Sequence, residues 1–267
     1  MRQTEAVVTG LWLYAIGRAG HPLPPSVDAI DGSGKVESVA EGPLAAFCTP
    51  VDLRQYSQQA VDSHTGDIEW LGAIGYRHQA VMQALMQGGT VIPLRAFTLF
   101  GSHQMVEAQL RSGRDQFLKV LERLEGKQEW TLRIEFDPRQ WNDALTSRVD
   151  SLRTLAGEIE SAAPGKAFLL KKKLDDERKR VSRDAELQVV GEIEQKVLSK
   201  LRCETVAESR EQREGAFPQI NVLINRDEEA VLQELHRDLS DRYAGEGITL
   251  SVSGPWPPYT FASVSNA

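Results

Sequence analysis

The sequence predicts an α+β protein of two domains. Its 267 residues exceed the roughly 100–150 residues of a typical single domain, so each half is long enough to bury its own core. Stretches with the two-residue period of strands alternate with stretches that have the 3.6-residue period of helices. In the second half they follow the order β-α-β-β-α-β, which is the ferredoxin-like arrangement. We expect a mixed α+β domain over residues 1–126 and a modified ferredoxin-like domain with extra helices over residues 127–267.

The first domain should be built around the strand at residues 10–17, because both of its faces carry apolar side chains: Leu11, Leu13 and Ala15 on one, Trp12, Tyr14 and Ile16 on the other. Residues 90–100 are rich in β-branched and aromatic side chains and predict another strand, with Pro93 at an edge, a bulge or a strand start. The predicted elements are strands at 10–17, 36–40, 44–51 and 90–100, and helices at 67–87, 102–110 and 112–124.

The second domain should begin after a junction at residues 125–127. Its first strand, at 128–136, alternates clearly and directs one set of side chains into the core, namely Trp130, Leu132, Ile134 and Phe136. Asp137 and Pro138 have the signature of a helix start. The predicted elements are strands at 128–136, 202–208, 219–225 and 248–253, and helices at 138–159, 164–201 and 225–243.

A run of basic residues at 171–183 raises the possibility of nucleic-acid binding. Acidic residues interleave with it, so ion pairs are expected at a spacing of four: Lys171–Asp175, Lys172–Asp176, Lys173–Glu177 and Asp175–Lys179. The net charge is -7, which opposes binding to a phosphate backbone. We interpret the run as a solvated helix, and we expect no nucleic-acid partner.

The sequence contains no pattern that selects a catalytic, cofactor-binding or metal-binding set. GxGxxG, GxxxxGKS and GxSxG are absent, and neither the five histidines nor the two cysteines have ligand spacing. Cys48 and Cys203 are expected to be reduced, and His78, on the apolar stripe of its helix, to be a satisfied core or interface histidine. No apolar run approaches the ~20 residues of a membrane-spanning helix, and the first residues do not resemble a signal peptide. We expect a cytoplasmic protein.

Arg95 lies inside an apolar run and therefore needs a partner, because an unpaired buried guanidinium is costly. A structural salt bridge is the favoured interpretation. The alternative is that Arg95 binds a carboxylate on a ligand or a partner protein.

The segment at residues 253–261 is rigid and apolar, since it holds three prolines, a glycine and three aromatic rings. Each proline fixes its own φ and favours extended geometry in the residue before it. We expect an ordered strand end in which Trp256 and Tyr259 pack against the body of the protein.

Several stretches resemble the gas vesicle protein family of the F and L type. They are Leu13-Tyr14-Ala15-Ile16, the helix around Trp70 and His78, Val91-Ile92-Pro93-Leu94-Arg95 with Thr98 and Phe100, Glu129-Trp130, Gly165-Lys166-Ala167-Phe168-Leu169, and Ser253-Gly254-Pro255-Trp256-Pro257-Pro258-Tyr259-Thr260-Phe261. The last is the most specific. One departure is that Ala96-Phe97-Thr98 stands where the family usually has Phe-Gly-Thr, and Phe97 cannot adopt the positive φ of glycine at low cost.

The resemblance implies the two-domain α+β fold and a non-enzymatic role as an accessory protein in gas vesicle formation. It also implies contact with the hydrophobic major shell protein and with other accessory proteins. The candidate interaction residues are Pro93, Arg95, Trp256, Pro258 and Tyr259. An alternative function is a small-molecule-binding or enzymatic ferredoxin-like domain that uses the cleft between domains. RNA binding by the sheet ranks last, because the alternating side chains of residues 130–136 form a core face.

Overall fold

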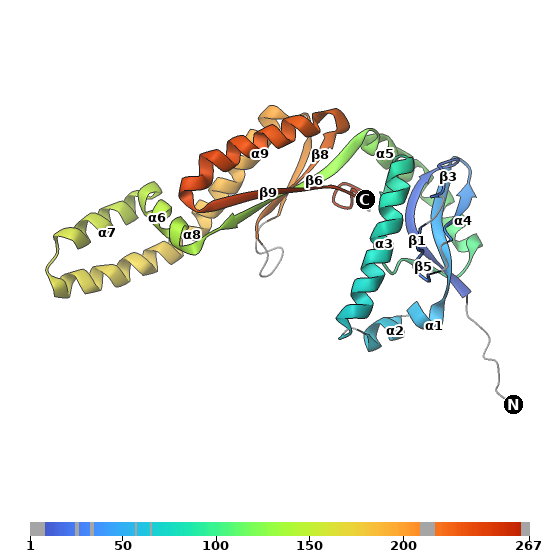
Figure 1. The fold of residues 1–267 in the computed structure, drawn as a ribbon, viewed down its shortest axis with the longest axis horizontal. Coiled ribbons are helices and arrows are strands. Elements are labelled where there is room, and N and C mark those ends of the chain that lie inside the picture. The colour runs from blue at the N-terminus through green and yellow to red at the C-terminus, as the bar shows by residue number, and fades with distance from the viewer. Residues whose placement is uncertain are drawn as a thin grey trace. The chain divides into compact units, whose positions relative to one another are not determined.

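The computed structural model describes residues 9–24, 27–32, 35–56, 58–64, 66–208 and 217–262. These residues are of mixed α and β structure and form two compact units, each with one antiparallel sheet (Figure 1). The described residues before Lys127 form the first unit together with residues 257–262. The second unit is Lys127–Trp256. Pro257 and Pro258 therefore pack with the first unit, whereas the sequence placed them in the second domain.

The first unit has five strands and several helices. Its sheet has the order β2-β3-β1-β4, and β5 also pairs with β1. Its elements are β1 (Thr9–Arg18), β2 (Glu37–Glu41), β3 (Leu44–Asp52), α1 (Leu53–Tyr56), α2 (Gln58–Ser63), α3 (Ile68–Gly88), β4 (Val91–Pro93), β5 (Leu99–Phe100), α4 (His103–Ser112) and α5 (Arg114–Leu124).

Strand β1 lies at the centre of this unit, and every residue between its two ends is buried. Helix α3 lies along one face of the sheet and α4 on the other, which explains why both faces of β1 are apolar (Figure 1). A bulge between Leu13 and Ala15 interrupts the predicted alternation, so that Ala15 packs in the same cluster as Trp12 and Tyr14.

The single strand predicted at 90–100 is wrong. The structure has two short strands, β4 and β5, which both pair with β1 and are separated by a turn at residues 94–98. Pro93 is the last residue of β4, at the edge of the main strand order, where its missing N–H costs no ladder bond. The remaining predicted strands and helices of this unit are present.

The second unit has four strands in the order β7-β8-β6-β9, all antiparallel. Its elements are β6 (Lys127–Phe136), α6 (Pro138–Arg148), α7 (Asp150–Ser161), α8 (Pro164–Lys200), β7 (Glu204–Glu208), β8 (Gln219–Asn225), η1 (Arg226–Glu228), α9 (Glu229–Tyr243), η2 (Ala244–Glu246) and β9 (Ile248–Trp256). The helical region predicted at 138–159 is divided into two helices, because Val149 is extended and ends α6.

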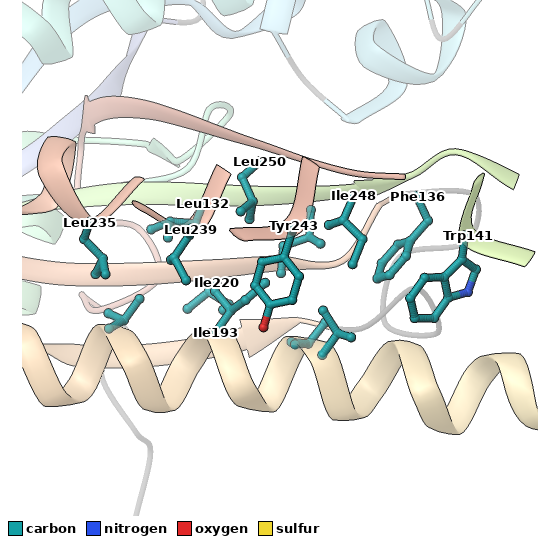
Figure 2. Packing of buried hydrophobic residues seen from close by; sticks show 14 of the residues in the cluster. Leu132, Phe136, Trp141, Ile193, Ile220, Leu235, Leu239, Tyr243, Ile248 and Leu250 are labelled. Atoms are coloured by element: carbon teal, nitrogen blue, oxygen red, sulfur yellow. The ribbon is translucent and has the colours of Figure 1, made fainter. Parts of the chain in front are cut away.

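The core of the second unit lies between this sheet and helices α8 and α9. All four alternating apolar side chains of β6 are buried, as predicted. Figure 2 shows Leu235, Leu239 and Tyr243 of α9 beside the strands, with the Tyr243 hydroxyl directed toward α8. That hydroxyl donates a hydrogen bond to Glu192 Oε2 (3.1 Å). The buried aromatic face argues against the RNA-binding interpretation, which requires exposed rings on the sheet.

Helix α7 and the first half of α8 form a helical hairpin that extends away from the sheet of the second unit (Figure 1). The ion pairs predicted here at a spacing of four do not form. The arginines form pairs at a spacing of three instead, Asp175 with Arg178 (3.5 Å) and Glu177 with Arg180 (2.6 Å). In the described part of the chain, no helix is long and apolar enough to cross a membrane.

Candidate functional site

The closing motif is the stretch Ser253–Phe261, and its part from Pro257 onward packs into the first unit. Pro257, Pro258 and Phe261 are buried, and the Tyr259 N–H donates to the Pro257 carbonyl (2.7 Å), which bends the chain after β9. The Arg123 guanidinium, at the end of α5, donates to the carbonyl of Phe261. These contacts hold the end of the described chain against the unit that contains its beginning.

His78 is the centre of this packing. The Trp12 indole N–H donates to His78 Nδ1 (3.0 Å), and because an indole can only donate, the ring proton of neutral His78 lies on Nε2. His78 Nε2 lies 3.1 Å from the carbonyl oxygen of Leu94 and 3.2 Å from the hydroxyl of Tyr259. The cluster of Trp12, His78, Leu94 and Tyr259 therefore joins β1, α3, the turn after β4 and the closing motif. We call it the histidine cluster.

The histidine cluster is electrically neutral at pH 7. Burial lowers the pKa of His78, although the bond to the Leu94 carbonyl opposes the shift. Burial raises the pKa of Tyr259 to about 12, since its hydroxyl points inward even though part of the residue remains exposed. Because Trp12 occupies one ring nitrogen and the other holds the proton, His78 has no free lone pair with which to act as a base. The prediction that His78 is a satisfied core histidine is confirmed.

Arg95 does not occupy the buried position that the sequence suggested. The chain turns outward after Leu94, and Arg95 is exposed. Its carbonyl accepts bonds from the Thr98 hydroxyl (2.6 Å) and the Thr98 N–H (3.2 Å). Its guanidinium makes no ion pair with any residue that the structure describes, so the predicted structural salt bridge is wrong. An exposed arginine needs no internal partner, because water solvates it.

Phe97 adopts the backbone conformation that the sequence suggested it would avoid. Its φ is 66°, in the left-handed region that favours glycine. Its ring packs edge-on against Trp12, with 4.9 Å between ring centroids, and lies 6.0 Å from Trp70. Ring packing therefore offsets the backbone cost of placing phenylalanine where the family usually has glycine.

Trp256 lies at the other end of the closing motif, in the second unit. It is 39% exposed, and its indole N–H donates to Ser253 Oγ of the same strand (3.2 Å). Gly254 has a φ of 146°, and a Cβ there would lie 2.8 Å from the Trp130 ring, so only glycine fits. Trp256 and Tyr259 were both predicted to pack against the protein, and they are exposed to a similar extent, 39% and 37%. The Tyr259 hydroxyl faces His78, whereas the Trp256 indole N–H bonds within its own strand.

The described residues offer no site for metal or thiol chemistry. No group of three histidine, cysteine, aspartate or glutamate side chains among them is placed to hold a metal ion. Both cysteines are free, as predicted. Burial raises the pKa of Cys48 to about 12 and that of Cys203 to about 11, which keeps both thiols protonated and unreactive.

The structure brings four of the five predicted interaction residues into the first unit. Pro93 and Arg95 flank Leu94, whose carbonyl faces His78, and Pro258 and Tyr259 belong to the motif that contacts the same histidine. The sequence interpretation missed Trp12 and Phe97 as members of this packing. A tryptophan on a fully buried strand and a histidine on a buried stripe each need a polar partner, and that shared need was the available signal.

Comparison with known proteins agrees with this architecture. Residues 10–263 match the family model described as "Gas vesicle synthesis protein GvpL/GvpF". Gas vesicle protein L of Streptomyces sp. (strain CB03234) is 27% identical over 264 residues, covering 95% of this chain and 93% of that protein. Gas vesicle protein L of Haloferax mediterranei is 30% identical over 201 residues, covering 70% of this chain and 60% of that protein.

The crystal structure of the gas vesicle protein GvpF from Anabaena sp. PCC7120 has the same fold, with a TM-score of 0.68 at 17% identity, covering 97% of this chain and 98% of that one. The chain belongs to the GvpL/GvpF family of gas vesicle proteins.

Proposed function

We propose that this protein is a non-enzymatic accessory factor of gas vesicle formation that binds the hydrophobic major shell protein, or other vesicle proteins, during assembly. The family match over residues 10–263 carries the proposal. A shell made of apolar subunits needs partners that cover apolar surface before the subunits join. The protein would then act in the cytoplasm, at or near the growing vesicle.

The histidine cluster supports a structural rather than a catalytic role. Both nitrogens of His78 are engaged by Trp12, Leu94 and Tyr259. Burial raises the pKa of the Tyr14 phenol and of the Cys48 thiol to about 12 each. These groups hold their protons at neutral pH and point into the protein. They stabilise a rigid unit rather than offer a nucleophile or a base.

The predicted interaction residues divide into two roles. Arg95 and Trp256 are exposed and belong to residue types enriched in binding hot spots, so we propose that they contact a partner directly. Pro93 and Pro258 are buried, and the Tyr259 hydroxyl faces His78. We propose that these three position the contact surface and join the chain end to the first unit.

We further propose that the second unit is a domain of modified ferredoxin-like fold. In that fold the first and third strands are central and the second and fourth lie at the edges. Strands β6 and β8 hold the central places here, and β7 and β9 the edges. Helices α6 and α7 are then additions to the first crossover, and the domain boundary falls between Gly126 and Lys127.

Co-purification with the major shell protein tests the proposal. Tagged protein should capture the shell subunit, and Arg95→Glu should reduce capture by about five-fold or more, which corresponds to a contact worth about 1 kcal/mol. Arg139→Glu is the matched control, because Arg139 is also exposed but belongs to α6. If neither the shell protein nor any other vesicle protein co-purifies, and a deletion strain forms normal vesicles, the proposed function is wrong.

A further inference from the structure

The four most exposed large apolar side chains of the described residues occur as two pairs. Ile68 (83% exposed) and Tyr76 (78%) lie on α3, and Phe168 (72%) and Leu169 (67%) lie near the start of α8. The next in order, Met105, is 55% exposed. Single exposed apolar residues are ordinary, but paired ones on one helix face mark surfaces that associate.

The first surface is the hairpin tip, formed by the first turns of α8: Phe168, Leu169 and the lysines Lys166, Lys171, Lys172 and Lys173. All six residues are exposed. Lys172 and Lys173 follow the apolar pair by four residues and so lie next to it on the helix surface. Among the residues described, none of these lysines makes a hydrogen bond or a salt bridge, although Lys173 contributes to the lowered pKa of Glu177. The tip therefore combines a small apolar patch with lysines that can pair with a partner's carboxylates.

The second surface is the α3 face, formed by Ile68, Gly72 and Tyr76 with the acidic residues Asp67 and Glu69 beside Ile68. The first three are spaced by four residues, so they share the outward side of the helix. A Cβ at Gly72 would meet no atom within 4 Å, which leaves an open notch between the two large side chains. Glycine inside an exposed helix is unfavourable relative to alanine, and no packing contact requires it here.

We infer that this protein associates head to tail with a second copy of itself, the hairpin tip of one copy docking on the α3 face of the next. Phe168 would enter the notch at Gly72, between Ile68 and Tyr76. The tip lysines would lie near Asp67 and Glu69. The apolar side chains of the tip would then pack on those of the α3 face, and the tip lysines would face its carboxylates. The inference goes beyond the proposed function, because it concerns contacts between copies of this chain.

The two surfaces are different, so the contact is heterologous, and an open assembly of any length keeps one free tip at one end and one free face at the other. Unless a ring closes, such assembly continues without a fixed number of copies. With two large apolar side chains on each side the interface is small, and the association is correspondingly weak. The charge contribution makes it weaker at high salt.

A protein partner fits the tip better than an anionic lipid surface. Between residues 158 and 176 the hairpin carries four lysines and four carboxylates, the latter at Glu158, Glu160, Asp175 and Asp176, so the net charge of this stretch is zero. Attraction to a bilayer depends on a net positive charge over a wide surface, and this stretch has no net charge even though its tip lysines make no salt bridge. A protein surface can instead pair with the lysines that lie next to the apolar patch.

Sedimentation velocity of the full-length protein over a range of concentrations tests the inference. The wild type should show an average mass that rises continuously with concentration, and less so at high salt. A tip variant, Phe168→Ser with Leu169→Ser, and a face variant, Ile68→Ser with Tyr76→Ser, should each remain monomeric, with folding checked by circular dichroism. An equimolar mixture of the two should form a dimer and nothing larger, because each variant keeps the one surface that the other lacks.

Three outcomes would overturn the inference: a wild type that is monomeric at every concentration, variants that still associate, or a mixture that forms no dimer. A flotation assay with phosphatidylglycerol vesicles covers the lipid alternative. Wild type that binds these vesicles without self-associating, with binding lost in the tip variant, would assign the tip to a membrane instead.

Glycine substitution provides a second readout that loss of folding cannot imitate. Gly72→Ala should raise the melting temperature, since alanine fits the open space and favours a helix. It should also fill the notch and lower the association constant about five-fold or more. Gly191→Ala on α8 is the control, because a Cβ there also meets no atom within 4 Å. Gly191→Ala should raise stability and leave the association constant unchanged. If both variants associate equally well, the notch at Gly72 is not part of the contact.

Discussion

The strained residue in the turn at 94–98 provides the sharpest test of how this fold is stabilised. Phe97 holds a φ of 66° while its ring packs on Trp12. Two substitutions separate these effects: Phe97→Ala removes the ring and keeps the backbone cost, whereas Phe97→Gly removes both. The comparison of alanine with glycine therefore isolates the backbone cost.

The expected magnitudes follow from the structure. Truncating a fully buried phenylalanine to alanine costs about 3–5 kcal/mol, and Phe97 is half-buried, so Phe97→Ala should cost about 2 kcal/mol. A non-glycine residue in the left-handed region costs about 1–2 kcal/mol, and the greater freedom of unfolded glycine returns about 0.4–1 kcal/mol. The central values of these two terms differ by about 0.8 kcal/mol, so the glycine variant should be more stable than the alanine variant by about that amount.

Urea denaturation followed by tryptophan fluorescence measures this difference, because Trp12 and Trp70 lie beside the ring of Phe97. Phe100 is the matched control, since it is also half-buried but lies in strand β5 without a positive φ. At Phe100 the order should reverse, with glycine less stable than alanine by about 0.5–1 kcal/mol. If the alanine variant at position 97 is as stable as the glycine variant or more stable, the backbone there carries no strain for ring packing to offset.

Three further substitutions test the closing motif and the histidine cluster. Gly254→Ala should destabilise the protein by at least about 2 kcal/mol, because its Cβ would lie 2.8 Å from the Trp130 ring at a φ of 146°; an unchanged melting temperature would contradict this. Tyr259→Phe removes the hydroxyl that faces His78 and should cost about 0.5–1.5 kcal/mol in thermal unfolding, whereas an equal or higher stability would show that the bond contributes nothing. His78 has a folded pKa below its ordinary value of 6.5, so the unfolded state binds the proton more readily and stability falls as the pH drops below that value. His78→Gln can still accept and donate, and should reduce this loss in denaturant titrations from about pH 7 to pH 5. Burial also lowers the pKa of His21, so His21 should account for the loss of stability at low pH that remains in the His78 variant. An unchanged pH dependence in that variant would show that His78 does not cause the loss.

The elements that could be predicted are those whose side chains repeat along one buried face. Helix α3 buries Ile74, His78 and Val81 on one stripe, and β6 buries alternate residues. The spacing of apolar residues in the sequence is therefore enough to predict both elements. The caps are equally local: Asp137 accepts from the N–H groups of Arg139 (3.0 Å) and Gln140 (2.8 Å). In each case the determining contacts lie within a few residues of one another.

The elements that could not be predicted depend on residues far apart in the chain. The stretch at 90–100 has strand composition throughout, yet β4 and β5 pair with opposite ends of β1 and the chain must turn between them. That turn exposes Arg95, which a continuous strand would have placed in the apolar run. Likewise, Lys171 has acidic neighbours at the right spacing, but the arginines engage the carboxylates at a spacing of three.

The candidate site could be predicted only as separate parts. Trp12, Leu94 and Tyr259 meet at His78 from segments up to 181 residues apart, and no local pattern connects them. The sequence interpretation identified His78 as a satisfied core residue because it searched for charged partners and found none. What satisfies the ring is an indole, a carbonyl and a phenol, which are common groups whose proximity only the fold creates.

The motifs that resemble the family divide into those that the packing of the fold explains and one that it does not. The stretches 13–16, 91–94 and 257–261, which carry much of the resemblance to the family, lie within the first unit and contribute buried side chains to it, so packing accounts for them. The stretch at residues 165–169 differs, because Phe168 and Leu169 are exposed and no contact within the second unit explains them. A motif that the fold does not need is better explained by a surface that binds, and the hairpin tip is where this chain presents one.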